Sequence, residues 1–163
     1  MQSQSPSRSA APLRAGSVRD RLHACGLRPT RQRVALGELL FRDGDRHLAA
    51  ETLHRELANR GARMSLATVY NTLRQFDEAG LTRRVGINGG RSQYDTCTGD
   101  HQHFYVEDED RLIDIPVGAI RFGCLPAPPA GYRISRVDVL IRLRRIGALG
   151  AKSEVGDEPS RQG

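Results

Sequence analysis

The segment from residue 65 to residue 95 constrains the fold most, because it joins an amphipathic helix directly to a hairpin. In "SLATVYNTLRQFDEAG", apolar residues recur at the spacing of one helical face, at Leu66, Val69, Leu73 and Phe76. Ser65 is suited to cap the start of this helix, and Gly80 is suited to its end. Two short runs, 81–85 and 92–95, then flank the turn sequence "NGG", which favours a hairpin. This order predicts the second half of a winged helix-turn-helix.

Three further helical patterns precede this segment, in "SVRDRLHACG", "RPTRQRVALGELLF" and "HLAAETLHRELANRG". Ser17 is expected to cap the first helix and Gly26 to end it, while Pro29 lies near the start of the second. The third pairs Leu53 with Leu57 on one face. Together these helices complete the N-terminal part of a winged helix-turn-helix domain.

The outer face of the helix at 65–80 is polar and has no carboxylate before Asp77. Hydroxyl, amide and guanidinium groups of this kind can contact base edges or phosphates. The candidate DNA-contacting residues of the helix are Thr68, Tyr70, Asn71 and Arg74. The candidate phosphate-contacting residues are Arg28 and the hairpin arginines Arg83, Arg84 and Arg91. A small helical domain with a solvated polar face is the alternative interpretation.

The charge distribution agrees with a polyanion partner. The net charge is +6, and residues 1–100 carry 16 arginines against 10 acidic residues. Charge alone does not establish nucleic-acid binding. Nearly every basic residue is arginine, and a preference for arginine over lysine can also reflect the base composition of the genome. No apolar run approaches the roughly 18 residues of a membrane span, and the first 16 residues have no hydrophobic core for a secretory signal. We therefore expect a cytoplasmic protein with no membrane partner.

The second half of the chain is rich in strand patterns. "HFYVE" and "LIDI" are short β-prone runs joined by acidic residues, and "YRISRVDVLIRLRR" alternates apolar and polar residues. The alternation changes register near Ser135 or Arg136, which predicts a β-bulge there. The prolines of "GCLPAPPAG" disfavour a long regular helix. A sheet of three strands is too small to be stable alone.

The triplet His101-Gln102-His103 has the spacing of a shared metal ligand. Alternate residues of a strand point to the same side, so the two imidazoles can meet one ion while Gln102 points away. A pair of surface histidines is the commoner explanation of such a triplet. A hydrolytic metal centre is a rival function, but the sequence has no HExxH, phosphate loop or Ser/Cys-His arrangement. A metal-independent architectural DNA-binding protein is the third possibility.

Several of these segments resemble the ferric uptake regulator family. The resemblance rests on "GLRPTRQRVALGELLF", "AAETLHREL", "SLATVYNTLRQFDEAGL" and "YDTCTGDHQHFYVEDEDRLIDI", and it covers about residues 18–146. Within the family, "HFYVE", "LIDI" and "GYRISRVDVLIRLRR" look most like the iron response regulator branch. The resemblance implies an α+β fold, in which a winged helix-turn-helix precedes a small α/β dimerisation domain with a three-stranded antiparallel sheet. The expected divisions are a disordered tail at 1–16, the DNA-binding domain at 17–96, the dimerisation domain at 97–146 and a second disordered tail at 147–163.

The resemblance also implies a ligand set and a function. The family's regulatory metal site corresponds to His47, Asp95, His101, His103 and Asp114, and three imidazoles with two carboxylates suit Fe²⁺, Mn²⁺ or Zn²⁺. The iron response regulator branch is linked to haem, for which His101 or His103 would be the axial ligand; two rings on one strand face cannot hold opposite sides of one haem iron. Gln102 weakens the haem interpretation, because that branch usually has histidine there.

Departures from the family pattern matter as well. Val106 and Glu109 occupy the positions of the cysteine pair that holds a structural zinc in many relatives, so no structural zinc is expected. The expected protein is a homodimeric, non-enzymatic transcription regulator. It would bind a partly palindromic operator in double-stranded DNA and respond to iron status through haem or a divalent metal. The direction of the response, repression or release, stays open.

Overall fold

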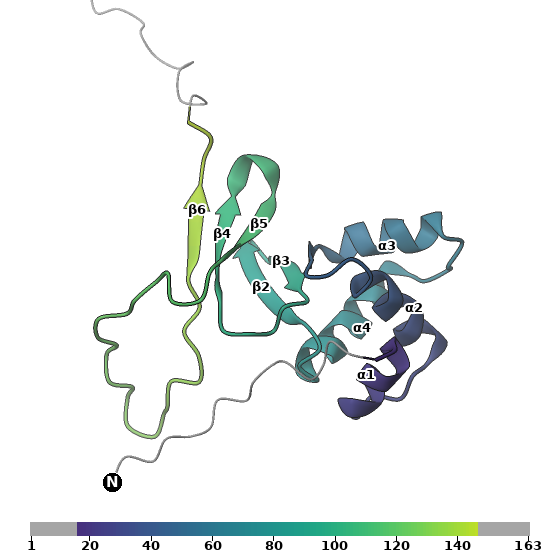
Figure 1. The fold of residues 1–163 in the computed structure, drawn as a ribbon, viewed down its shortest axis with the longest axis horizontal. Helices are drawn as coiled ribbons and strands as arrows, with labels where there is room; N and C mark the ends of the chain where they lie inside the picture. Colours follow the sequence, from purple (N-terminus) through teal and green to yellow (C-terminus); the bar gives the residue numbers. More distant parts are fainter. Residues whose placement is uncertain (1–15, 147–163) are drawn as a thin grey trace, which may run out of the picture. The chain divides into compact units, whose positions relative to one another are not determined.

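The computed structural model describes residues 16–146 of the chain (Figure 1). The chain divides into two compact units, and the division falls between His101 and Gln102. Each unit is described separately below. The tails expected at 1–16 and 147–163 lie outside the described residues, apart from Gly16.

Four helices make up most of the first unit. They are α1 (Val18–Ala24), α2 (Arg31–Leu40), α3 (Ala50–Asn59) and α4 (Leu66–Glu78). Side-chain caps begin three of them, because the hydroxyls of Ser17, Thr30 and Ser65 each accept a backbone N–H from the first helical turn. The backbone N–H of Ser17 in turn donates to Oδ2 of Asp20 at 3.0 Å, which completes a capping box. All four predicted helices are thus confirmed.

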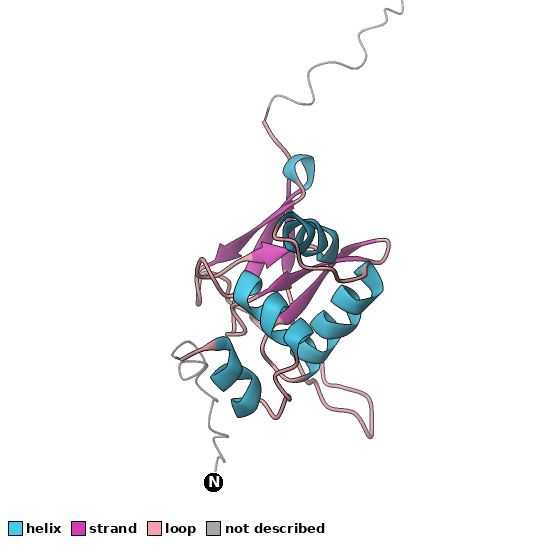
Figure 2. Ribbon diagram, turned by 90° about the vertical axis from the view of Figure 1, so that its right-hand side faces the viewer, coloured by secondary structure: helices cyan, strands magenta, loops and turns pink. Residues whose placement is uncertain are grey.

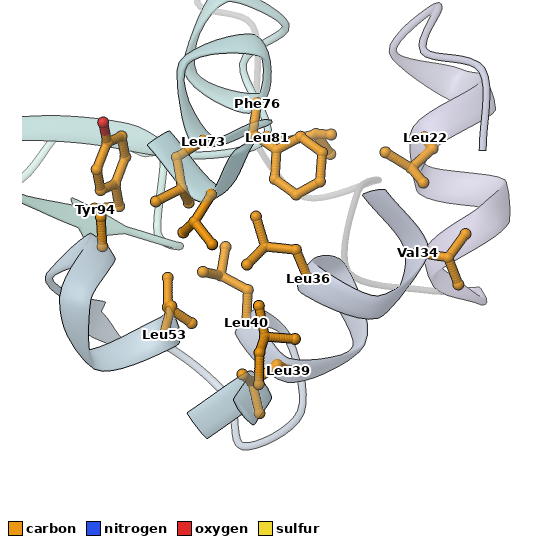
Figure 3. Packing of buried hydrophobic residues seen from close by; sticks show 13 residues of the cluster. Leu22, Val34, Leu36, Leu39, Leu40, Leu53, Leu73, Phe76, Leu81 and Tyr94 are labelled. Atoms are coloured by element: carbon orange, nitrogen blue, oxygen red, sulfur yellow. The ribbon is translucent and has the colours of Figure 1, made fainter. Parts of the chain in front are cut away.

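The apolar faces of these helices form the main core. Figure 3 shows Leu36, Leu40, Leu53 and Leu73 pointing toward one another, and each of them is 0 % exposed. Phe76 stacks on the partly buried ring of Phe41, with 6.4 Å between the ring centroids. Each such side chain contributes roughly 1.5–3 kcal/mol through burial. This core holds the outer face of α4 in a fixed place.

A three-stranded antiparallel sheet completes the first unit (Figures 1 and 2). Its strands are β1 (His47–Leu48), β2 (Arg83–Asn88) and β3 (Arg91–Asp95), in the order β1-β3-β2. The predicted hairpin turn is confirmed as the pair Gly89-Gly90, whose φ angles of 52° and 86° explain the need for glycine. Strand β1 was not predicted, because two residues carry no periodicity.

The second unit is built on strands β4 (Gln102–Val106), β5 (Arg111–Ile115) and β6 (Leu140–Leu143). The order is β5-β4-β6; β4 pairs antiparallel with β5 and parallel with β6. The expected three-stranded sheet is thus present, and β6 is the strand whose direction differs from the antiparallel pairing expected. Strand alternation specifies which face a residue occupies but not the direction of the strand, so the sequence pattern could not distinguish the two.

One further expectation for this unit needs correction. The third strand begins at Leu140, so the predicted bulge at Ser135 or Arg136 lies outside any strand. Between residues 102 and 146, the helical structure is one short 3-10 helix, η2 (Glu107–Glu109). As the prolines predicted, residues 116–139 form no long helix. Among the helices of residues 16–146, none has the length and apolar character needed to cross a membrane.

Candidate metal centre and nucleic-acid interface

Asp95 is the centre of a buried group of potential metal ligands in the first unit. It is the last residue of β3, and it lies opposite His47 on β1 and Arg83 on β2. Its side chain is completely buried, and its Oδ1 accepts the backbone N–H of Cys97 at 2.7 Å. A buried carboxylate is costly unless cations or hydrogen-bond donors surround it. The neighbours of Asp95 therefore indicate which kind of ion this group of side chains can bind.

Two imidazoles face this carboxylate. Nε2 of His101 lies 2.9 Å from Oδ2 of Asp95, and Nε2 of His47 lies 3.6 Å from Oδ1. Nδ1 of His101 lies 3.1 Å from the carbonyl oxygen of Gly99. A carbonyl only accepts, so this contact forms when Nδ1 carries the proton; in that tautomer Nε2, the nitrogen that faces Asp95, is the one that can bind a metal. The ligand atoms of the three residues lie within 4.8 Å of one another, close enough to meet one ion.

The second unit holds a smaller group of the same chemistry. His103 on β4 pairs in register with Asp114 on β5, and Nε2 of His103 lies 3.5 Å from Oδ1 of Asp114. His103 is 1 % exposed. Gln102 does not join the histidines: its Oε1 accepts the backbone N–H of Val139 at 2.5 Å. This agrees with the expectation that Gln102 points away from the ligands.

The five predicted ligand residues thus fall into two groups, one in each unit. His47, Asp95 and His101 belong to the first, and His103 and Asp114 belong to the second. Only Gln102 separates His101 from His103 in the chain, so the two groups are covalently close. Three imidazoles and two carboxylates are the donors that Zn²⁺, Fe²⁺ and Mn²⁺ accept.

The predicted DNA-reading face of α4 is exposed and borders the wing. Tyr70, Asn71 and Arg74 are exposed, whereas Thr68 is half-buried and its hydroxyl pairs with that of Ser65. A surface cavity of about 210 Å³ joins α4 to the hairpin, lined by Tyr70, Asn71, Arg74, Asp77, Arg84, Gly90, Ser92 and Tyr94. Helix and hairpin therefore present one continuous surface.

One residue of this surface was missed by the sequence analysis. Glu51, at the start of α3, accepts a hydrogen bond of 2.5 Å from the hydroxyl of Tyr70. This bond lowers the pKa of Glu51, and it raises the pKa of Tyr70. No sequence signal could have found the pair, because the two residues are 19 positions apart and no local pattern links them.

The hairpin arginines divide into two classes. Arg84 and Arg91 are exposed, as is Arg28 before α2, so all three can reach phosphates. Arg83 was expected to join them, but it is only 7 % exposed and donates to the carbonyls of Gly99 and His101. The expectation for Arg83 was wrong because alternate residues of β2 face opposite sides, and Arg83 lies on the buried side.

Comparison with known proteins agrees with this architecture. The model of the ferric uptake regulator family matches residues 24–121. The chain is 36% identical over 99 residues to the ferric uptake regulation protein of Shigella flexneri, covering 61% of this chain and 62% of that protein. It is 33% identical over 115 residues to the peroxide operon regulator of Bacillus subtilis, covering 70% of this chain and 79% of that protein.

A solved structure gives the same result. The ferric uptake regulator of Pseudomonas aeruginosa with manganese superposes with a TM-score of 0.60 at 26% identity, covering 78% of this chain and 97% of that one. The chain covers less than two thirds of the Shigella flexneri relative's length, so its activity is argued separately below. The predicted combination of a winged-helix domain with a dimerisation domain is confirmed by this likeness. The chain belongs to the ferric uptake regulator family.

Proposed function

We propose that the protein is a transcription regulator whose affinity for operator DNA is set by a divalent metal ion. The observation that carries this proposal is the position of Asp95. This buried ligand-type carboxylate ends the strand that also forms the wing, so one short strand joins the ligand group to the DNA-facing hairpin. Both curated relatives are named as regulators, and neither name describes an enzyme. A hydrolytic function therefore has no support.

The DNA-binding part of the proposal rests on α4 and the hairpin. Side chains at the exposed face of a recognition helix can reach base edges in the major groove, while basic residues of a wing contact phosphates. We assign Tyr70, Asn71 and Arg74 to the groove, and Arg28, Arg84 and Arg91 to the DNA backbone. We also assign Thr68, at the start of the helix, to the DNA contact through its hydroxyl, which pairs with that of Ser65.

The metal-binding part combines the two ligand groups. We propose that His47, Asp95, His101, His103 and Asp114 hold one ion, so that the ion bridges the two units. The solved relative from Pseudomonas aeruginosa contains manganese. Such a bridge would restrict the orientation of the DNA-binding unit relative to the dimer, which is how binding energy at one site changes affinity at another.

Haem is the second candidate ligand, because the sequence resembles the iron response regulator branch. In that case His101 or His103 would be the axial ligand. Both imidazoles are buried, and Nε2 of each lies beside a carboxylate of its own unit. That arrangement favours a small cation over haem, so the divalent metal is our first choice.

A homodimer completes the proposal. The described part of the second unit exposes large apolar side chains, namely Val117, Phe122, Leu125, Tyr132 and Ile134. A sheet of three short strands is marginal by itself, and a second copy can cover such residues. A twofold dimer also matches a partly palindromic operator.

The test is a titration of the full chain with Fe²⁺, Mn²⁺, Zn²⁺ and haem in separate experiments, while operator binding is followed by fluorescence anisotropy. We expect at least one divalent metal to change operator affinity tenfold or more, about 1.4 kcal/mol of coupling. A response to haem alone, with a Soret band, would show that the regulatory ligand is haem and not a divalent metal. Tight operator binding that no ligand changes would instead identify an architectural DNA-binding protein.

A further inference from the structure

Arg83 is a buried arginine in the strand that joins the wing to the ligand group. It lies on β2, directly opposite Asp95 on β3. Arginine is almost never buried unless it is paired, because its charge loses hydration. Arg83 is only 7 % exposed, so the contacts of its guanidinium indicate its role.

The guanidinium of Arg83 holds the backbone around a metal ligand. Nη1 donates to the carbonyl of His101 at 2.9 Å and makes a longer contact of 3.4 Å with the carbonyl of Gly99. The Gly99 carbonyl also accepts the Nδ1–H of His101 at 3.1 Å. Arg83 and the His101 ring thus share one acceptor, so Arg83 supports both the backbone and the imidazole of His101.

This support matters for the ring's other nitrogen. The partner of the outer N–H of a ligating histidine sets the tautomer and orientation of the ring. With Nδ1 held by Gly99, Nε2 of His101 points at Asp95, 2.9 Å away. The contacts that place the imidazole of His101 are therefore connected, through Arg83, to β2, the first strand of the wing.

The next residue of β2 faces the DNA side. Arg84 is exposed, its side chain donates to the hydroxyl of Ser92 at 2.8 Å, and its backbone N–H donates to Asp77 of α4 at 2.8 Å. Adjacent residues of one strand thus contact the ligand group and the DNA-facing surface. A shift of β2 at Arg83 therefore also displaces Arg84.

We propose that Arg83 is a positioning residue that supports His101 as a ligand for a divalent cation and transmits occupancy of the site to the wing. This inference rests on the proposed function and adds a residue that the ligand set does not include. It assigns Arg83 to the response to metal, and Arg84 to DNA affinity itself.

The experiment compares Arg83→Gln with the matched control Arg84→Gln in the full-length protein. Co²⁺ affinity is measured from the visible absorption of the bound ion, and operator affinity is measured with and without Mn²⁺. For Arg83→Gln we expect about tenfold weaker Co²⁺ binding or more, an altered Co²⁺ spectrum and a reduced response to Mn²⁺. Its metal-free operator affinity should stay within about twofold of the parent. For Arg84→Gln we expect parent-like Co²⁺ binding and weaker operator binding in both states.

The outcomes separate this inference from the proposed function. If the parent protein shows no response to any metal, the proposed function fails. If the parent responds and folded Arg83→Gln keeps the parent's Co²⁺ affinity and Mn²⁺ response, the inference is overturned. Equal losses of operator affinity with and without metal would also overturn it, because Arg83 would then only support the wing. Should circular dichroism show that Arg83→Gln is unfolded, Arg83→Met provides the same comparison, since it keeps the buried stem without a polar head.

Discussion

The hydrogen bond from Tyr70 to Glu51 determines which polar groups the exposed face of α4 presents. Because the hydroxyl proton of Tyr70 is donated to the carboxylate, the oxygen's lone pairs remain for contact with a donor. A carboxylate beside a phosphate-binding surface also opposes non-specific binding through like-charge repulsion. At the residue scale, this pair therefore bears on the selectivity of the proposed DNA contact.

The first prediction concerns the ionisation of Glu51. The hydrogen bond from Tyr70 is the main cause of its lowered pKa, so Tyr70→Phe should raise the Glu51 pKa toward its ordinary value. Since the folded pKa is lowered, the pair's stabilisation is present above the unfolded pKa of about 4.3 and is lost as pH falls through the folded pKa. NMR titration of the Glu51 carboxyl in both proteins measures the shift. An unchanged Glu51 pKa in Tyr70→Phe would show that the bond does not form in solution.

The second prediction concerns sequence selectivity. Asn71 is exposed on α4, and an amide is suited to pair with adenine in the major groove. Asn71→Ala should weaken operator binding by about 1–3 kcal/mol and relax the choice of base at one position of each half-site. Binding to a panel of single-base operator variants measures this. The assignment of α4 fails if Asn71→Ala keeps both the affinity and the base preferences of the parent.

At the element scale, α4 depends on its N-terminal cap. The Oγ of Ser65 accepts the backbone N–H of Thr68 at 3.2 Å, and no acidic residue in the first turn can substitute for it. Ser65 also pairs with the Thr68 hydroxyl at 2.8 Å. The position at which α4 begins therefore depends on the side chain of Ser65, while the core holds its outer face in place.

The third prediction follows from this cap. Ser65→Ala should lower the free energy of unfolding of the first unit by about 1 kcal/mol. Urea unfolding followed by far-UV circular dichroism reports on this unit, because the α-helices of the described chain all belong to it. Ser135→Ala, at an exposed serine outside any helix or strand, is the control and should have no effect. Equal stability of Ser65→Ala and the control would mean that the cap contributes nothing.

The elements also show which parts of the structure the sequence could predict. The helices were predictable because caps and a 3.6-residue period are local signals, and Gly89-Gly90 identifies its own turn. Strand β1, the burial of Arg83 and the parallel direction of β6 were not predictable, because each depends on pairing with a distant strand. The spacing of residues in the sequence predicted only His101 and His103 as a ligand pair. The other three candidate ligands, His47, Asp95 and Asp114, were implied by the family resemblance.

At the scale of the whole molecule, the first unit is stabilised by an apolar core of its own. The first unit has a core of apolar side chains from four helices, and that core contains no ligand-type residue. The described cysteines, Cys25, Cys97 and Cys124, are all free thiols, and none of them belongs to the ligand groups. We propose that metal binding regulates the protein.

The fourth prediction tests this expectation. Exhaustive chelation should leave the protein folded and dimeric, because the proposed metal is regulatory and no cysteine zinc site is expected. Circular dichroism and light scattering before and after chelation are the measurements, with metal analysis of the released fraction. Release of one zinc per chain together with loss of the dimer would contradict it and would indicate a structural zinc.

The central claim is that one divalent ion, held by ligands of both units, sets the affinity for DNA. Its most direct test is operator affinity with and without saturating Mn²⁺ in the parent, His47→Ala and His103→Ala, which remove one ligand from each unit. The parent should change affinity tenfold or more, about 1.4 kcal/mol, and both variants should lose most of that change while keeping metal-free affinity within a few-fold of the parent. If either variant keeps the full response of the parent, the ion does not depend on both units, and the account is contradicted.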